Sequence, residues 1–161
     1  MFFKKGDWVV HCTHGLGQIL AIEERSFDTK NSHYYMVQVE DMTIWIPDDE
    51  NLKSRLRRPS TEDEFRKWLK IFSEPAEKLP DDRRIRNTQL TETLKSGEAE
   101  ALCKVIRNLT AYRHNHSWSE YDGALIKRVQ KTLIGEWSFA LSVTSHEAET
   151  ELHKLLSIKE A

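Results

Sequence analysis

The 161-residue sequence predicts an α+β protein, in which a small β-rich module is followed by an all-helical module. Up to about Pro47, Val, Ile, Tyr and Trp recur with the period-two alternation of strands. After Pro59, apolar residues recur at helical spacing instead. The change of period falls within residues 53–60. We therefore expect two domains, at residues 1–57 and 58–161.

Four strands are expected in the first module, at residues 8–12, 18–24, 34–40 and 42–46. Gly15 and Gly17 supply positive-φ freedom for the turn after the first strand. Residues 28–32 are typical of a hairpin loop, and Asp41 marks a tight reversal between the last two strands. Because four strands cannot cover two faces as a flat sheet, we expect them to curl into a small half-open barrel.

Five helices are expected in the second module, and side-chain caps mark several of their starts. Ser60-Thr61 followed by Asp63-Glu64 is typical of a capping box for the first helix, which Pro75 ends. Ser117 followed by Glu120 predicts the cap of the fourth helix, which continues to about Leu141. The other helices are expected at about residues 81–95 and 98–113, and from Ser145 onward.

Composition narrows the class of protein. The net charge of −2 gives no global reason to expect nucleic-acid binding. No run of about 18 apolar residues suggests a membrane span, and charged residues follow Met1–Phe3 at once, unlike a signal peptide. Cys12 and Cys103 lie in dissimilar segments, as in reduced intracellular proteins. We expect a cytoplasmic protein without a membrane partner.

The motifs that would indicate catalysis or a cofactor are weak. His11, Cys12 and His14 could form the corner of a zinc site, but no fourth ligand with recognisable spacing follows. The two glycines at 15 and 17 are too few for a dinucleotide fingerprint, and there is no Walker-type loop. No nucleophile has a local catalytic signature. We expect no enzyme activity, cofactor, metal or small-molecule substrate.

Clustered basic residues are the remaining chemical signal. One cluster lies in the first turns of the second expected helix, near its positive dipole end, where phosphate is a natural partner. The other lies on the fourth expected helix, offset from its apolar stripe. The alternative is an ordinary solvated helix face. Since no base-reading motif is present, DNA binding would depend on backbone charge and shape. The clusters are Arg83, Arg84 and Arg86, and Lys127, Arg128 and Lys131.

Several segments together resemble the CarD-like family of bacterial transcription regulators, whose amino-terminal module is shared with transcription-repair coupling factors. The resemblance covers nearly the whole chain and includes both modules. In the first module it rests on residues 3–11, 14–17, 22–23 and 44–47, the last reading Ile-Trp-Ile-Pro. In the second module it rests on residues 94–97, 105–109 and 133–136.

The resemblance implies a function for the first module. In the family this module is Tudor-like and docks on the RNA polymerase β subunit by strand-to-strand pairing and side-chain contacts. By position, Arg25 and Trp45 would lie in the polymerase-facing region, although the family often has a basic residue where Trp45 stands. The polymerase-binding residues expected here are Arg25, Ile44, Trp45, Ile46 and Pro47.

The resemblance also implies that the helical module contacts promoter DNA upstream of the melted region and modulates open-complex stability. In the family, a tryptophan wedges into the minor groove, and that position falls on Arg83 here. Arginine can enter a narrowed minor groove but cannot replace an apolar wedge. A polymerase-binding adaptor without productive DNA contact is therefore the alternative. The expected DNA-binding residues are the six basic residues of the two clusters.

Overall fold

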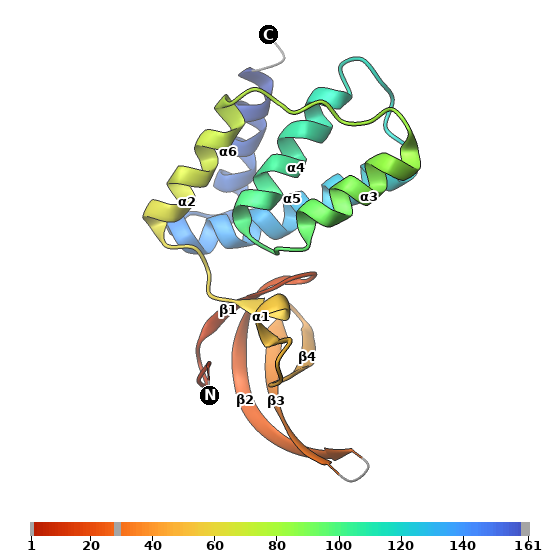
Figure 1. Cartoon of the computed structure of the whole chain (residues 1–161). Helices are drawn as coiled ribbons and strands as arrows, with labels where there is room; N and C mark the ends of the chain where they lie inside the picture. Colours follow the sequence, from red (N-terminus) through yellow and green to blue (C-terminus); the bar gives the residue numbers. More distant parts are fainter. Residues whose placement is uncertain (1, 28–29, 159–161) are drawn as a thin grey trace. The chain divides into compact units, whose positions relative to one another are not determined.

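The computed structural model describes residues 2–27 and 30–158, and the chain divides into two compact units at Pro59/Ser60 (Figure 1). We call residues up to Pro59 the β unit and residues from Ser60 the helical unit. The first contains an antiparallel sheet and the second is built of helices, which confirms the α+β class.

The β unit is a five-stranded antiparallel sheet with the strand order β4-β3-β2-β1-β5. The expected four strands are present, and a short fifth strand pairs with β1 through Val10↔Arg57 and His11↔Leu56. β4 and β5 are the two edges, so the sheet does not close into a barrel. The elements are β1 (Trp8–His11), β2 (Gly15–Phe27), β3 (Lys30–Val39), β4 (Met42–Pro47), α1 (Leu52–Arg55) and β5 (Leu56–Arg57).

Strand β3 extends into the expected hairpin loop at residues 28–32, and β2 runs up to its start. β2 continues to Phe27 and β3 already begins at Lys30, so the loop prediction was too long. Asp28 and Thr29 of that loop lie outside the described residues. The turn between β3 and β4 consists of Glu40 and Asp41, with a positive φ of 56° at Glu40.

Two glycines after β1 serve different purposes. Gly15 has a φ of 86°, as the turn prediction requires. Gly17 lies within β2, where a Cβ would come 2.7 Å from the backbone oxygen of Gln38, so any side chain would be too close. A register shift between Ile19 and Ala21 marks a bulge, which increases the local twist of the strand. The core beneath the sheet includes Phe3, Val9, Ile19, Tyr35, Val37 and Ile46.

Several helices of the helical unit begin at side-chain caps. Thr61 and Glu64 form the expected capping box of the first helix. The fourth expected helix is capped by Ser119 and Asp122, so the prediction of Ser117 as its cap was wrong. The elements are α2 (Glu62–Leu69), the 3₁₀ helix η1 (Lys70–Ser73), α3 (Arg83–Leu94), α4 (Ala99–Tyr112), α5 (Glu120–Leu141) and α6 (Ser145–Ile158).

Helix α4 is the central element of the helical unit. It packs against α2, η1, α3 and α5, and for this reason it is buried on most of its surface. Its core residues include Leu102, Val105, Ile106 and Leu109. Within residues 2–27 and 30–158, no helix combines the length and apolar character that a membrane span requires.

Candidate functional site

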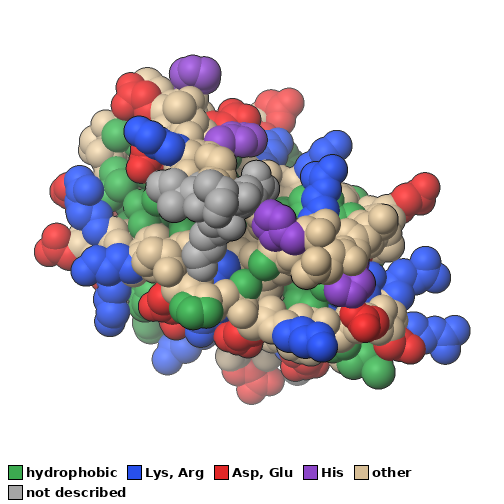
Figure 2. Space-filling view, turned by 90° about the horizontal axis from the view of Figure 1, so that it is seen from above, with side chains coloured by type: hydrophobic (Ala, Val, Ile, Leu, Met, Phe, Trp, Pro, Cys, Tyr) green, Lys and Arg blue, Asp and Glu red, His purple; other side chains and the backbone are tan. Residues whose placement is uncertain are grey.

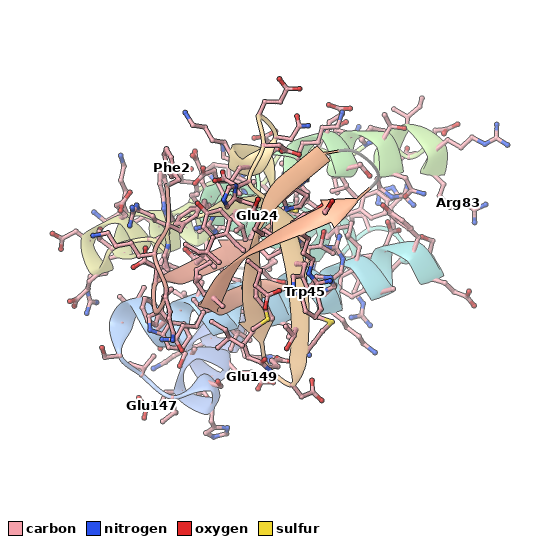
Figure 3. The ribbon with its side chains drawn as sticks, turned by 90° about the horizontal axis from the view of Figure 1, so that it is seen from below. Phe2, Glu24, Trp45, Arg83, Glu147 and Glu149 are labelled. Carbon is pink, nitrogen blue, oxygen red and sulfur yellow. The ribbon has the colours of Figure 1, made fainter. Side chains whose placement is uncertain are left out.

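Three side chains form a cluster on the outer face of the β unit, which we call the Trp45 cluster: Glu23, Arg25 and Trp45. Trp45 is labelled in Figure 3. The Arg25 guanidinium lies 4.7 Å from the centre of the Trp45 ring. The Glu23 carboxylate accepts a hydrogen bond from the Trp45 indole at 3.2 Å and pairs with Arg25 at 3.4 Å. The indole remains 41% exposed. The cluster therefore presents an aromatic and a cationic group together, held in place by a carboxylate.

Strand β4 has an open edge beside this cluster. Asp48 donates its backbone N–H to the His33 oxygen, and hydrogen-bonded pairs alternate along an antiparallel ladder. Ile46, Ile44 and Met42 are then the residues bonded to β3. The backbone N–H and C=O groups of Thr43 and Trp45 consequently point away from the sheet, as in an edge that can accept another strand. Pro47, which has no N–H, also lies at an outward position, as expected.

The five residues expected to bind polymerase differ in the exposure of their side chains. Arg25 and Trp45 are brought together on the exposed face. Ile46 is only 6% exposed and belongs to the core, and Ile44 is partly buried against the same core. Pro47 is half-buried at the end of β4. Glu23 was missed, although its spacing of two from Arg25 places both on one face of β2.

The first turn of α3 carries two exposed arginines, Arg83 and Arg84. Arg83 points away from the helix end (Figure 3). The Asp82 carboxylate accepts hydrogen bonds from the backbone N–H groups of Arg84 and Ile85, at 2.9 and 3.1 Å. A phosphate here would thus meet side chains rather than the helix end. Ile85, which was not among the predicted residues, is 58% exposed beside them.

Arg86 is not on the surface, although it follows these residues directly. It is 3% exposed and its guanidinium makes a two-pronged pair with Asp122, at 3.0 and 3.3 Å. It also donates to the oxygens of Pro80 and Asp81 and to the Tyr112 hydroxyl, at 3.0–3.1 Å. Every guanidinium nitrogen therefore has a protein acceptor. The buried position of Arg86 therefore indicates a structural role rather than the predicted contact with DNA.

Both members of this buried pair stay charged. Burial disfavours the Asp122 carboxylate, but hydrogen bonds from Arg86 and Ser119 outweigh it and hold the pKa of Asp122 below its usual range. The hydrogen bond to Asp122 raises the pKa of Arg86. The pair joins α3 and α5, and Arg86 also ties down the chain that leads into α3.

The basic residues of α5, namely Lys127, Arg128 and Lys131, are all exposed as expected. They lie opposite the buried stripe of the helix, which contains Val129 and Leu133. α3 is anchored to α5 at Asp122, and Lys127 lies five residues further, about 8 Å along the helix axis. Over the face seen in Figure 2, Lys and Arg side chains alternate with Asp, Glu and His. On this face the basic side chains do not form one continuous surface.

His11 and His14, which were candidates for a zinc site, shape the turn after β1. His11 Nδ1 accepts hydrogen bonds from the backbone N–H groups of Thr13 and His14, both at 3.1 Å, and the two imidazoles stack. Burial, together with His14 and Arg55, lowers the pKa of His11 to about 4. Across the described ranges, no three His, Cys, Asp or Glu side chains are placed to hold a metal ion.

Comparison with known proteins gave matches for both units. Residues 3–59 match the family model described as "CarD-like/TRCF RID domain". Residues 67–153 match the model described as "CarD, C-terminal domain". A relative from Bacillus subtilis (strain 168), named "Putative transcription factor YdeB", is 26% identical over 152 residues, which cover 92% of this chain and 98% of the relative.

Proposed function

The chain belongs to the CarD-like family of bacterial transcription regulators, and from this premise we propose that it binds RNA polymerase and promoter DNA. In this proposal the β unit docks on the polymerase β subunit. The helical unit contacts DNA upstream of the melted region and modulates the stability of the open complex. The observation that carries the proposal is the match of each unit to one of the two family models.

Polymerase docking is supported by the surface that the β unit presents. The outward backbone groups of Thr43 and Trp45 offer hydrogen bonds to an incoming strand. The Trp45 cluster lies on the adjoining face and supplies an aromatic and a cationic side chain, which are the types enriched at energetically important contacts. Ile44 and Ile46 act indirectly in this proposal, by anchoring β4 on the core.

DNA contact is supported by the first turn of α3. Arg83 and Arg84 supply cations for phosphates or for a narrow minor groove, and both side chains are exposed. Ile85 adds an exposed apolar side chain of a type that inserts between base steps. It is the better candidate for an apolar wedge than Arg83. Lys127, Arg128 and Lys131 would add phosphate contacts along α5.

An exposed isoleucine is also consistent with the alternative, an adaptor that binds polymerase and recruits a second protein through its helical unit. The two functions differ in their dependence on salt. Phosphate contacts release counterions, so DNA binding weakens steeply as salt rises, whereas an apolar protein contact does not. The experiments below therefore test the two halves of the proposal separately.

The polymerase half is tested by co-elution of the full-length protein with the isolated lobe of the polymerase β subunit. Arg25→Glu should weaken the association about tenfold or more, because it reverses a charge and removes the cation stacked on Trp45. Lys5→Glu is the matched control, since Lys5 is an exposed cation of the same unit. Equal binding by both variants and the parent protein would contradict docking through the Trp45 cluster.

The DNA half is tested with a fork-junction promoter fragment bound at several salt concentrations. Arg83→Ala/Arg84→Ala should lower the slope of log affinity against log salt by about two, one for each phosphate contact. The control is Arg66→Ala/Lys67→Ala, an adjacent exposed basic pair on α2. Arg86 is left unchanged because its loss would disturb folding. An unchanged slope, with polymerase binding retained, would favour the adaptor.

A further inference from the structure

The helical unit has a hollow surface away from the residues discussed so far, where the carboxyl end of α4 meets α5 and α6. Two adjoining hollows of about 340 and 380 Å³ share Thr110, Arg113 and Trp118 in their walls. His114 lines the first hollow, and His153 and Lys154 line the second. We call this surface the Arg113 groove.

The ionisable side chains that line the Arg113 groove are basic: Arg113, His114, His153 and Lys154. Within the part of the chain that the structure describes, no carboxylate pairs with Arg113 or Lys154, while His153 lies 3.8 Å from Glu149. Some other cations of the helical unit do have such partners: Arg66 with Glu62, Lys95 with Glu92, and Lys104 with Glu100. Two uncompensated cations facing one hollow attract an anion.

One wall of the groove is aromatic and is held by a hydrogen bond. The Trp118 indole donates a hydrogen bond to the Leu109 backbone oxygen at 2.8 Å, which fixes the orientation of its ring. The Arg113 guanidinium lies 4.5 Å from the centre of that ring. Stacking on a fixed indole limits the freedom of the arginine side chain, while the edge of its guanidinium remains able to donate hydrogen bonds. The cation is thus partly preorganised for a ligand.

We propose that the Arg113 groove binds a phosphate group, carried either by a small nucleotide or by a nucleic-acid backbone. Arginine matches phosphate oxygens with two parallel hydrogen bonds, Lys154 adds a second charge, and the Thr110 hydroxyl can donate a further bond. None of the residues assigned above to polymerase or DNA lines this groove. The inference therefore concerns a different surface from the proposed polymerase and DNA contacts, and it can fail while those contacts hold.

The test is a titration of the full-length, ¹⁵N-labelled protein at constant ionic strength, followed by NMR. The probes are inorganic phosphate, ATP and a short DNA duplex. Because the Trp118 indole N–H is bonded to Leu109, its resonance reports directly on this wall. We expect saturable shifts of this resonance and of the Arg113 and Lys154 amides. Shifts with phosphate and ATP identify a free nucleotide as the source, and shifts with DNA alone identify a backbone.

Variants then assign the binding to the groove. Arg113→Glu/Lys154→Glu should weaken the affinity for the active probe about tenfold or more, since two charge-assisted contacts become repulsive. Lys70→Glu/Lys78→Glu is the control with the same change in net charge, at exposed sites outside the groove, and it should bind like the parent protein. Absence of saturable shifts with all three probes, shifts confined to α3, or equal weakening by both double variants would overturn the proposal.

Discussion

At the scale of single residues, Arg83, Arg84 and Arg86 carry the same charge within four positions, yet only the first two are exposed. The difference follows from helical periodicity. Arg86 lies one turn before the buried Leu90 and so faces the core side of α3. A guanidinium there needs a buried acceptor, and Asp122 supplies it. Exposure, rather than charge, therefore distinguishes a possible phosphate contact from a structural residue.

We predict that Arg86→Ala lowers the free energy of unfolding of the helical unit by about 3–5 kcal/mol, because it leaves the Asp122 carboxylate buried and unpaired. Arg83→Ala should change it by less than about 0.5 kcal/mol, as expected for an exposed side chain. Urea unfolding followed by circular dichroism measures both. The double variant Arg86→Met/Asp122→Leu should recover part of the loss, because it leaves no buried charge unpaired, although it removes the capping box of α5. A loss below about 1 kcal/mol for Arg86→Ala would contradict the structural role.

We predict that the stability of the β unit depends on pH through His11. Its pKa is about 4 when folded, against 6.5 for an unperturbed histidine, so between these values the unfolded chain binds a proton that the folded chain does not. The contribution of His11 to stability is complete above pH 6.5 and is lost as the pH falls towards 4. Urea midpoints at pH 7.5 and pH 5 should show this decrease.

The control for this pH dependence is His11→Asn, whose side-chain oxygen can still accept from Thr13 and His14 but does not titrate. The variant should lose less stability between the two pH values than the parent protein does. An equal loss in both proteins would assign the effect to other groups.

At the scale of elements, β4 has two different sides. Its inward backbone groups complete the ladder with β3, and its outward groups at Thr43 and Trp45 face away from the sheet. Edge strands of this kind are often blocked by charges or proline. Here, proline occupies only the last position of the strand, Pro47. Most of the edge is therefore accessible to a partner strand.

We predict that Thr43→Pro reduces polymerase binding more than it reduces stability, because it removes an outward N–H and leaves the ladder with β3 intact. Ile44→Pro is the comparison, since it removes an N–H that the ladder uses and should unfold the β unit. Binding to the polymerase β lobe and thermal unfolding are measured for both. Full binding by a folded Thr43→Pro protein would show that docking does not extend the sheet through this position.

At the scale of the whole molecule, the two units have separate hydrophobic cores that share no residue. The division falls at Pro59/Ser60, and Ser60 is held to the helical unit by the buried Glu136 carboxylate, which accepts from its backbone N–H and hydroxyl at 2.9 and 2.7 Å. Since each unit packs around its own core, a destabilising substitution in one unit should lower mainly the stability of that unit.

We predict unit-specific effects on thermal unfolding followed by NMR of the full-length protein. Gly17→Ala should destabilise the β unit by about 1–3 kcal/mol, because the new Cβ would lie 2.7 Å from the Gln38 oxygen. The signals of the helical unit should keep their midpoint. Arg86→Ala should do the reverse. If either variant shifts both midpoints equally, the units unfold as one.

The parts of the fold that are encoded by short stretches of sequence were predictable. Period-two and helical spacing located four strands and five helices, and the Thr61 capping box lies where expected. Strand β5 was missed because it has only two residues and exists through its pairing with β1. The cap of α5 was misplaced because Ser117 and Ser119 both precede an acidic residue by three positions. Asp122, which Arg86 also holds, completes the box with Ser119.

By itself, the sequence determined the α+β class, the order of the two modules and the family, because these follow from periodicity and from motifs that are contiguous in the chain. Only the tertiary structure decided which side chains are available to partners. It buried Arg86 and Ile46, joined Glu23 and Arg25 to Trp45, and grouped Arg113 with Lys154. These outcomes depend on contacts between residues far apart in the chain, which no local pattern encodes.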